Sequence, residues 1–182
     1  MKKILFLICT LSLLTAIFAS CSDEEANPTF SKREYVFCLF DVHQYAELFN
    51  VMGNYGQFAS IRKRVVNGVT KFSIANSSSA HDYTVDALSK DFGLGLGGLI
   101  VGTNNYGETL CYDLACPICD RASRRLTLTA DGYARCAKCL VTYDMNNYGA
   151  IYKIPQDTTL NKPRGLYRYR VNYNGQILNA YN

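Results

Sequence analysis

Short runs of alternating hydrophobic and polar residues recur along the chain, and tight-turn residues separate them. Asn67-Gly68 lies between two such runs and Asn174-Gly175 between two others. An Asn-Gly pair in this setting predicts a β-hairpin, because both turn residues must accept positive φ. With further turns at 104–107 and 131–132, the pattern predicts four hairpins, whose arms are 58–66 and 69–75, 97–103 and 108–115, 124–130 and 133–139, and 166–173 and 176–182.

No window carries a sustained helical period with end caps, so the pattern predicts an all-β domain, an antiparallel barrel or sandwich. Residues 33–40 are rich in aromatic and branched aliphatic side chains and predict one more buried strand. Residues 45–52 leave two alternatives open, one helical turn or an irregular crossing. The Gly-rich stretch 93–98 lacks the preceding strand and following helix of a phosphate-binding loop, so we interpret it as a flexible lead into a strand.

The first twenty residues have the organisation of a secretory signal peptide. Lys2 and Lys3 precede a largely apolar run that is too short to span a bilayer, which takes about 20 residues. The small residues Ala19 and Ser20 then lead directly to Cys21. This order resembles the lipobox of bacterial lipoproteins, which implies cleavage before Cys21 and lipidation of its thiol and new amino group. The alternative is an ordinary signal peptide cut nearby, which leaves Cys21 unmodified.

Lipidation would make the membrane the partner of the mature chain. Residues 21–29 would then form a flexible tether, and residues 30–182 would form a single domain. The acidic residues that follow Cys21 resemble surface-export signals of some bacterial lipoproteins. We therefore predict a lipid-anchored protein of the cell envelope, at the outer membrane or the cell surface.

Charge and polar motifs add no catalytic or nucleic-acid signal. The formal net charge is only +4, so we predict no nucleic-acid partner and interpret 60–64 as a solvated strand face. The stretch 76–82 places serines beside His81 and Asp82. Catalytic triads need spatial rather than sequential neighbours, so we interpret 76–82 as a polar loop and predict that the protein is not an enzyme.

Two CxxC pairs, with sixteen residues between them, carry the strongest chemical signal: Cys116, Cys119, Cys136 and Cys139. This spacing is typical of zinc sites. The segment between the pairs is itself a predicted hairpin, so both pairs can come to one end of it. Four thiolates without histidine predict a closed tetrahedral site. Asp113 and Asp144 flank the pairs, and we expect them to cap turns or to accept hydrogen bonds from loop amides.

The sequence around these cysteines resembles the two cluster-binding boxes of Rieske-type domains. The residues that carry the resemblance are the stretches 106–119 and 136–153, with Tyr143, Asp144 and Gly149 following the second pair. The resemblance covers roughly 95–182. It implies a Rieske-like antiparallel β fold, with a zinc-ribbon or rubredoxin-like metal-binding subdomain, about 110–152, inserted into a larger β base.

The ligands differ from those of the family, because a Rieske centre needs two histidines on one iron. Ile118 and Cys139 occupy the histidine positions, and His43 and His81 lie upstream of both boxes. We predict structural Zn²⁺. The alternatives are an iron centre that carries electrons, either an all-cysteine [2Fe–2S] cluster or a single rubredoxin-like iron, and two disulfides without metal.

Four further positions bear on the cysteines. Asp120 and Leu140 replace the glycines that normally follow such ligands, which loosens the analogy to Rieske loops and rubredoxin-like turns. Cys38 and Cys111 lie in apolar strand patterns and are predicted to be buried. The alternative for this pair is a disulfide, which an oxidising compartment would allow.

Overall fold

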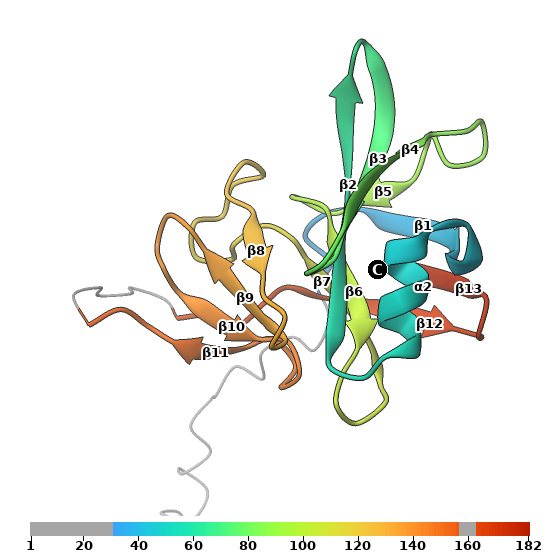
Figure 1. The fold of residues 1–182 in the computed structure, drawn as a ribbon. Coiled ribbons are helices and arrows are strands. Elements are labelled where there is room, and N and C mark those ends of the chain that lie inside the picture. Colours follow the sequence, from blue (N-terminus) through green and yellow to red (C-terminus); the bar gives the residue numbers. More distant parts are fainter. Residues whose placement is uncertain (1–30, 157–162) are drawn as a thin grey trace, which may run out of the picture.

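The computed structural model describes residues 31–156 and 163–182, whose regular secondary structure is mostly strand (Figure 1). The predicted signal peptide 1–20, the lipidation site Cys21 and the whole tether 21–29 lie outside the described residues. Within the described ranges, no helix is long and apolar enough to cross a membrane.

All strands pair antiparallel, in two sheets, which confirms the predicted all-β class. The larger sheet contains β1 (Val36–Asp41), β2 (Gln57–Val66), β3 (Val69–Ala75), β4 (Ala80–Thr84), β5 (Gly93–Leu94), β6 (Leu99–Thr103), β7 (Thr109–Asp113), β12 (Arg168–Tyr173) and β13 (Ile177–Tyr181). Its spatial order is β4-β3-β2-β6-β7-β12-β13-β1-β5. Because β5 also contacts β2, the sheet curls around its own core.

The smaller sheet forms between β7 and β12 in the sequence and lies to one side of the larger one (Figure 1). Its strands are β8 (Leu126–Leu128), β9 (Tyr133–Cys136), β10 (Thr142–Asp144) and β11 (Ala150–Lys153). Their order is β11-β10-β9-β8. The range 110–152 that the resemblance implied for a subdomain includes most of β7, which pairs in the larger sheet.

The four predicted hairpins are confirmed as β2–β3, β6–β7, β8–β9 and β12–β13. At the first turn Asn67 has φ 51° and Gly68 has φ 78°. Both turn residues therefore adopt the left-handed conformation that the Asn-Gly pair predicted. This local chemistry is why the hairpins could be located from the sequence.

The undecided segment 45–52 contains a helix, α2 (Ala46–Gly53), which follows a short 3-10 turn, η2 (Val42–Gln44). Leu48, Val51 and Met52 are buried on one side of α2, where the helix contacts β2, β3 and β6. The helix thereby covers one opening of the curled sheet (Figure 1).

Two interpretations of loops were wrong in part. The stretch 76–82 is not a loop throughout, because Ala80–Thr84 forms β4 and pairs with β3. The Gly-rich stretch 93–98 leads into β6 as predicted, but it is not irregular throughout, because Gly93–Leu94 forms β5 and pairs with β1. Gly97 lies so close to Ala115 that a Cβ would come 2.6 Å from the Ala115 nitrogen. These glycines therefore allow close backbone packing, which their sequence pattern does not distinguish from mobility.

The buried side chains form two cores. The first lies inside the curled sheet and under α2, and includes Phe40 and Phe72. Cys38 and Cys111 belong to it, are fully buried as predicted, and are free thiols instead of a disulfide. The second core lies between the larger and smaller sheets. It contains Phe58, Ile100, Leu110, Tyr112, Leu114, Cys116, Leu126, Ala134, Cys136, Val141, Tyr143, Met145 and Leu166.

Candidate metal centre

The structure brings the four predicted cysteines together. The four Sγ atoms all lie within 4.8 Å of one another. The Cys116 and Cys139 sulfurs are 3.6 Å apart, and those of Cys119 and Cys136 are 3.7 Å apart. Four thiolates at about 2.3 Å from one tetrahedral zinc would be separated by about 3.8 Å. The arrangement thus has the dimensions of a four-sulfur metal site.

The two CxxC turns that present the sulfurs have the same backbone geometry. In the first, the amide of Asp120 donates to the carbonyl of Cys116 at 2.9 Å, and in the second Leu140 donates to Cys136 at 2.9 Å. Asp120 has φ 52° and Leu140 has φ 60°. In both turns the residue after the second cysteine therefore has the left-handed backbone conformation although it is not glycine. This conformation costs about 1–2 kcal/mol at each position.

Burial and amide contacts act on the thiols in opposite directions. Burial is the main cause that raises the pKa of Cys119, to about 11. Burial also acts to raise the pKa of Cys136, but the backbone amides of Cys139 and Lys138 outweigh it and lower that pKa. Cysteines bind a metal as thiolates, and several thiolates close together repel one another. A bound cation would offset this repulsion.

Tyr143 closes the buried side of the site. Its hydroxyl lies 3.6 Å from the Cys116 sulfur, and its ring is fully buried in the second core. Burial raises the pKa of Tyr143, and the contact with Cys116 raises it further. The hydroxyl therefore stays protonated and is available to donate to a sulfur.

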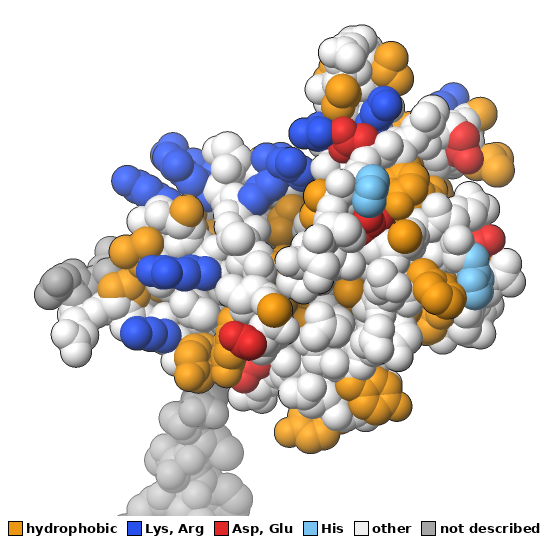
Figure 2. Space-filling model, viewed as in Figure 1, with side chains coloured by type: hydrophobic (Ala, Val, Ile, Leu, Met, Phe, Trp, Pro, Cys, Tyr) orange, Lys and Arg blue, Asp and Glu red, His pale blue; other side chains and the backbone are white. Residues whose placement is uncertain are grey.

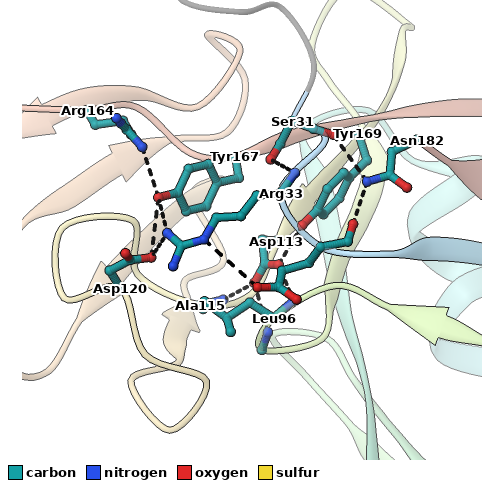
Figure 3. A network of polar contacts seen from close by, with 12 residues as sticks. Ser31, Arg33, Leu96, Asp113, Ala115, Asp120, Arg164, Tyr167, Tyr169 and Asn182 are labelled. Atoms are coloured by element: carbon teal, nitrogen blue, oxygen red, sulfur yellow. Dashed lines mark hydrogen bonds and ion pairs between the residues drawn. The ribbon is translucent and has the colours of Figure 1, made fainter.

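Asp113 fixes the chain just before the first CxxC turn (Figure 3). Its buried carboxylate accepts hydrogen bonds from the amides of Ala115 at 2.6 Å, Leu96 at 2.6 Å and Gly97 at 3.0 Å, and from the Tyr169 hydroxyl at 2.7 Å. Burial raises the pKa of Asp113, although these hydrogen bonds act against the rise. The predicted role of Asp113 as an acceptor for loop amides is confirmed.

Asp144 has the same role after the second CxxC turn. It accepts hydrogen bonds from the amides of Asn146 at 2.9 Å and Asn147 at 3.2 Å. The carboxylate thereby orders the turn between β10 and β11, as predicted. Neither Asp113 nor Asp144 belongs to the sulfur cluster.

An exposed contact joins the first CxxC turn to two distant segments (Figure 3). Arg33 forms an ion pair with Asp120 and donates to the Tyr167 hydroxyl at 3.0 Å. Arg164 donates to the same hydroxyl at 3.0 Å. The hydrogen bond to Asp120 is the main reason that the pKa of Arg33 is raised. Nothing in the local sequence indicated this contact, because its members are far apart in the chain.

The two histidines lie elsewhere, and no histidine of the described residues joins the sulfur cluster. His43 lies in η2, and His81 in β4 contacts the carboxylate of Glu47 on α2. Ser79 donates to Glu47 at 3.2 Å, and the Tyr83 hydroxyl donates at 2.7 Å. Serine and histidine thus both bind the carboxylate, whereas a triad needs the histidine to contact the serine.

Replacing Glu47 with glutamine is expected to destabilise the fold by about 1–3 kcal/mol at neutral pH, the usual range for hydrogen bonds to a charged group. Burial acts to raise the pKa of Glu47, but the hydrogen bonds from His81 and Tyr83 outweigh it and lower that pKa below its ordinary 4.5. The stabilisation is therefore present above about pH 4.5 and is lost as pH falls through the folded-state pKa. Urea denaturation of wild type and Glu47→Gln at several pH values measures the difference.

Asp91→Asn is the matched control, because the Asp91 side chain is 84% exposed and has only a long contact with Lys90. Its effect should stay within about 0.5 kcal/mol at every pH. A Glu47→Gln effect that persists unchanged at pH 3 would contradict the assignment of the stabilisation to the ionised carboxylate.

The chain has no significant match among protein-family models, curated proteins or solved structures. Its function is therefore inferred from the geometry of its own residues.

Proposed function

We propose that this is a lipid-anchored protein of the cell envelope whose four-cysteine centre binds one structural zinc ion. The observation that carries the proposal is the cluster of four Sγ atoms within 4.8 Å of one another. Soft thiolates suit zinc, and four protein ligands leave no open position for a substrate. The ion would tie the segment between β7 and β8 to the turn between β9 and β10, and it would perform no chemistry.

A single ion agrees better with these distances than a two-iron cluster does. A [2Fe–2S] cluster places two metals and two sulfides between its cysteine pairs, so the pairs must lie farther apart than around one ion. Here Cys116 contacts Cys139 at 3.6 Å, and Cys119 contacts Cys136 at 3.7 Å, so short distances join cysteines of different CxxC pairs. These contacts between the two CxxC pairs support a site in which all four cysteines surround one metal ion.

The second candidate is an electron carrier with a single iron on the same four sulfurs. Cys119 and Cys139 are partly exposed, which favours this candidate because electron exchange needs an accessible edge. An iron–thiolate centre changes charge by one electron, whereas zinc has no redox chemistry.

Elemental analysis of the full chain, purified in detergent without added metal, tests the proposal. About one zinc per chain and no visible colour would support the structural site, since four thiolates saturate a tetrahedral ion. One iron per chain with visible absorption would contradict the zinc site and support the single-iron electron carrier. Two irons with labile sulfide would establish the cluster, and a metal-free protein with intact cysteines would reject both candidates.

The Rieske-like interpretation extends this proposal to the fold. Its support is the order of the elements, with the small sheet inserted before the final pair, β12 and β13, of the larger sheet. An experimental structure with a different strand order would contradict it.

The lipid anchor rests on the signal-peptide pattern and on Cys21, which precedes the domain by a short polar segment. Cys21→Ala is expected to abolish the lipid mass shift and to release the domain from membranes. Membrane fractionation that is the same for wild type and variant, without a lipid mass in either, would rule out the anchor.

A further inference from the structure

A groove separates the outer face of β2, β3 and β4 from β8 of the smaller sheet. Its volume is about 490 Å³, within the range of about 300–1,000 Å³ for small-molecule sites. Figure 2 shows Lys and Arg side chains gathered over this side of the molecule. The lining residues that the argument uses are Ser60, Arg62, Arg64, Ser73, Asp82, Arg125 and Thr127.

The strand register places one wall of the groove. Ser60, Arg62 and Arg64 occupy alternate positions of β2, so their side chains share one face of the sheet. Arg62 lies opposite Ser73 on β3, which lies opposite Asp82 on β4. A row of polar side chains therefore crosses three strands on the face that turns away from the first core.

The charges of the groove are unbalanced. Arg64 is paired with Asp82, through Nε to Oδ1 at 3.0 Å and a second contact through Nη2. Asp82 is the one carboxylate among the lining residues. Within the described part of the chain, Arg62 forms no ion pair. Arg62 is partly buried; burial lowers its pKa, the nearby charges of Arg125 and Arg64 lower it further, and the charge of Asp82 only partly opposes them.

Gly97 and Gly98 lie beside the two arginines of the groove that form no ion pair in the described residues. Arg125 Nε donates to the Gly97 carbonyl at 2.8 Å, which orients the guanidinium. A Cβ on Gly98 would lie 3.1 Å from the Cβ of Arg62. Consecutive glycines therefore lie beside Arg125, which directly precedes β8, and beside Arg62 of β2, and both arginines line the same groove.

We propose that this groove binds a small ligand that carries a phosphate or carboxylate group, through the guanidinium groups of Arg62 and Arg125. Arginine is suited to this role because its planar donors match both oxyanions bidentately. The hydroxyls of Ser60, Ser73 and Thr127 line the same space and offer hydrogen bonds to a polar scaffold such as a sugar. The proposal is independent of which metal the cysteines bind.

Isothermal titration calorimetry of the full chain in detergent tests the site with three probes: glucose 6-phosphate, glucuronate and glucose. We expect binding of at least one of the two anions and none of glucose. The anion that binds more tightly identifies the source of the oxyanion as phosphate or carboxylate. No heat with either anion up to about 1 mM, a weak-affinity limit, would overturn the proposal.

Arg62→Gln and Arg125→Gln should each weaken binding of the better probe about tenfold, as expected for the loss of a charge-assisted contact. Arg62→Gln is the decisive variant, because Arg125→Gln also removes the hydrogen bond to the Gly97 carbonyl. Lys153→Gln is the matched control, since Lys153 is exposed on the edge strand β11 and does not line the groove. Equal weakening by Lys153→Gln would show a general charge effect and would overturn the assignment to the groove.

Discussion

Cys136→Ser is expected to remove the metal from the protein and to unfold the smaller sheet, while the larger sheet keeps its pairing. Closed four-thiolate zinc sites contribute about 10–16 kcal/mol in apparent binding free energy, which exceeds what a small sheet can supply alone. Cys136 is also buried in the second core beside Cys116, so its loss disturbs both ligation and packing. The expected change is therefore larger than for an ordinary core substitution.

The larger sheet should survive because its first core is separate. Phe40 and Phe72 lie in the first core and do not belong to the second core. Hydrogen exchange measures both regions in one experiment. We expect lost protection over β8 to β11 and retained protection over β2, β6 and β13.

Cys38→Ala is the control for this prediction, because Cys38 is buried in the first core, away from the sulfur cluster. It should leave the metal content at the wild-type value, although it costs some packing energy. Full metal content in Cys136→Ser, or unchanged protection of β8 to β11, would show that the cysteines do not hold a structural ion.

Asp113→Ala is expected to destabilise the whole protein by about 3–6 kcal/mol. The substitution leaves three backbone amides and the Tyr169 hydroxyl without their acceptor, and each unsatisfied buried donor costs about 1–3 kcal/mol. This loss is a large part of a typical free energy of unfolding, about 5–15 kcal/mol. Urea denaturation followed by tyrosine fluorescence measures it.

Two milder substitutions separate the hydrogen bonds from the packing. Tyr169→Phe removes one of the four donors and should cost about 1–3 kcal/mol, and Asp113→Asn should fall between it and Asp113→Ala. A loss below about 1 kcal/mol for Asp113→Ala would mean that water replaces the carboxylate and that the network does not stabilise the fold. Because Ala115 directly precedes Cys116, Asp113→Ala should also weaken metal retention.

The sequence by itself determined the features that depend on local chemistry. Asn67-Gly68 and Asn174-Gly175 located hairpins, because residues that accept positive φ, as Asn67, Gly68 and Gly175 do, mark tight turns in the sequence itself. The two CxxC pairs predicted the cluster, because two short turns joined by a hairpin leave few other arrangements. The roles of Asp113 and Asp144 as acceptors for loop amides followed from their positions beside these turns.

Only the tertiary structure decided the features that depend on distant partners. The stretch 76–82 contains few hydrophobic residues, yet part of it pairs with β3 because that edge was available. Glu47 and His81 meet because α2 packs against the sheet, and Arg62 and Arg125 line one groove because β8 returns beside β2. Such contacts join residues separated by tens of positions, and no periodicity along the chain encodes which strands become neighbours.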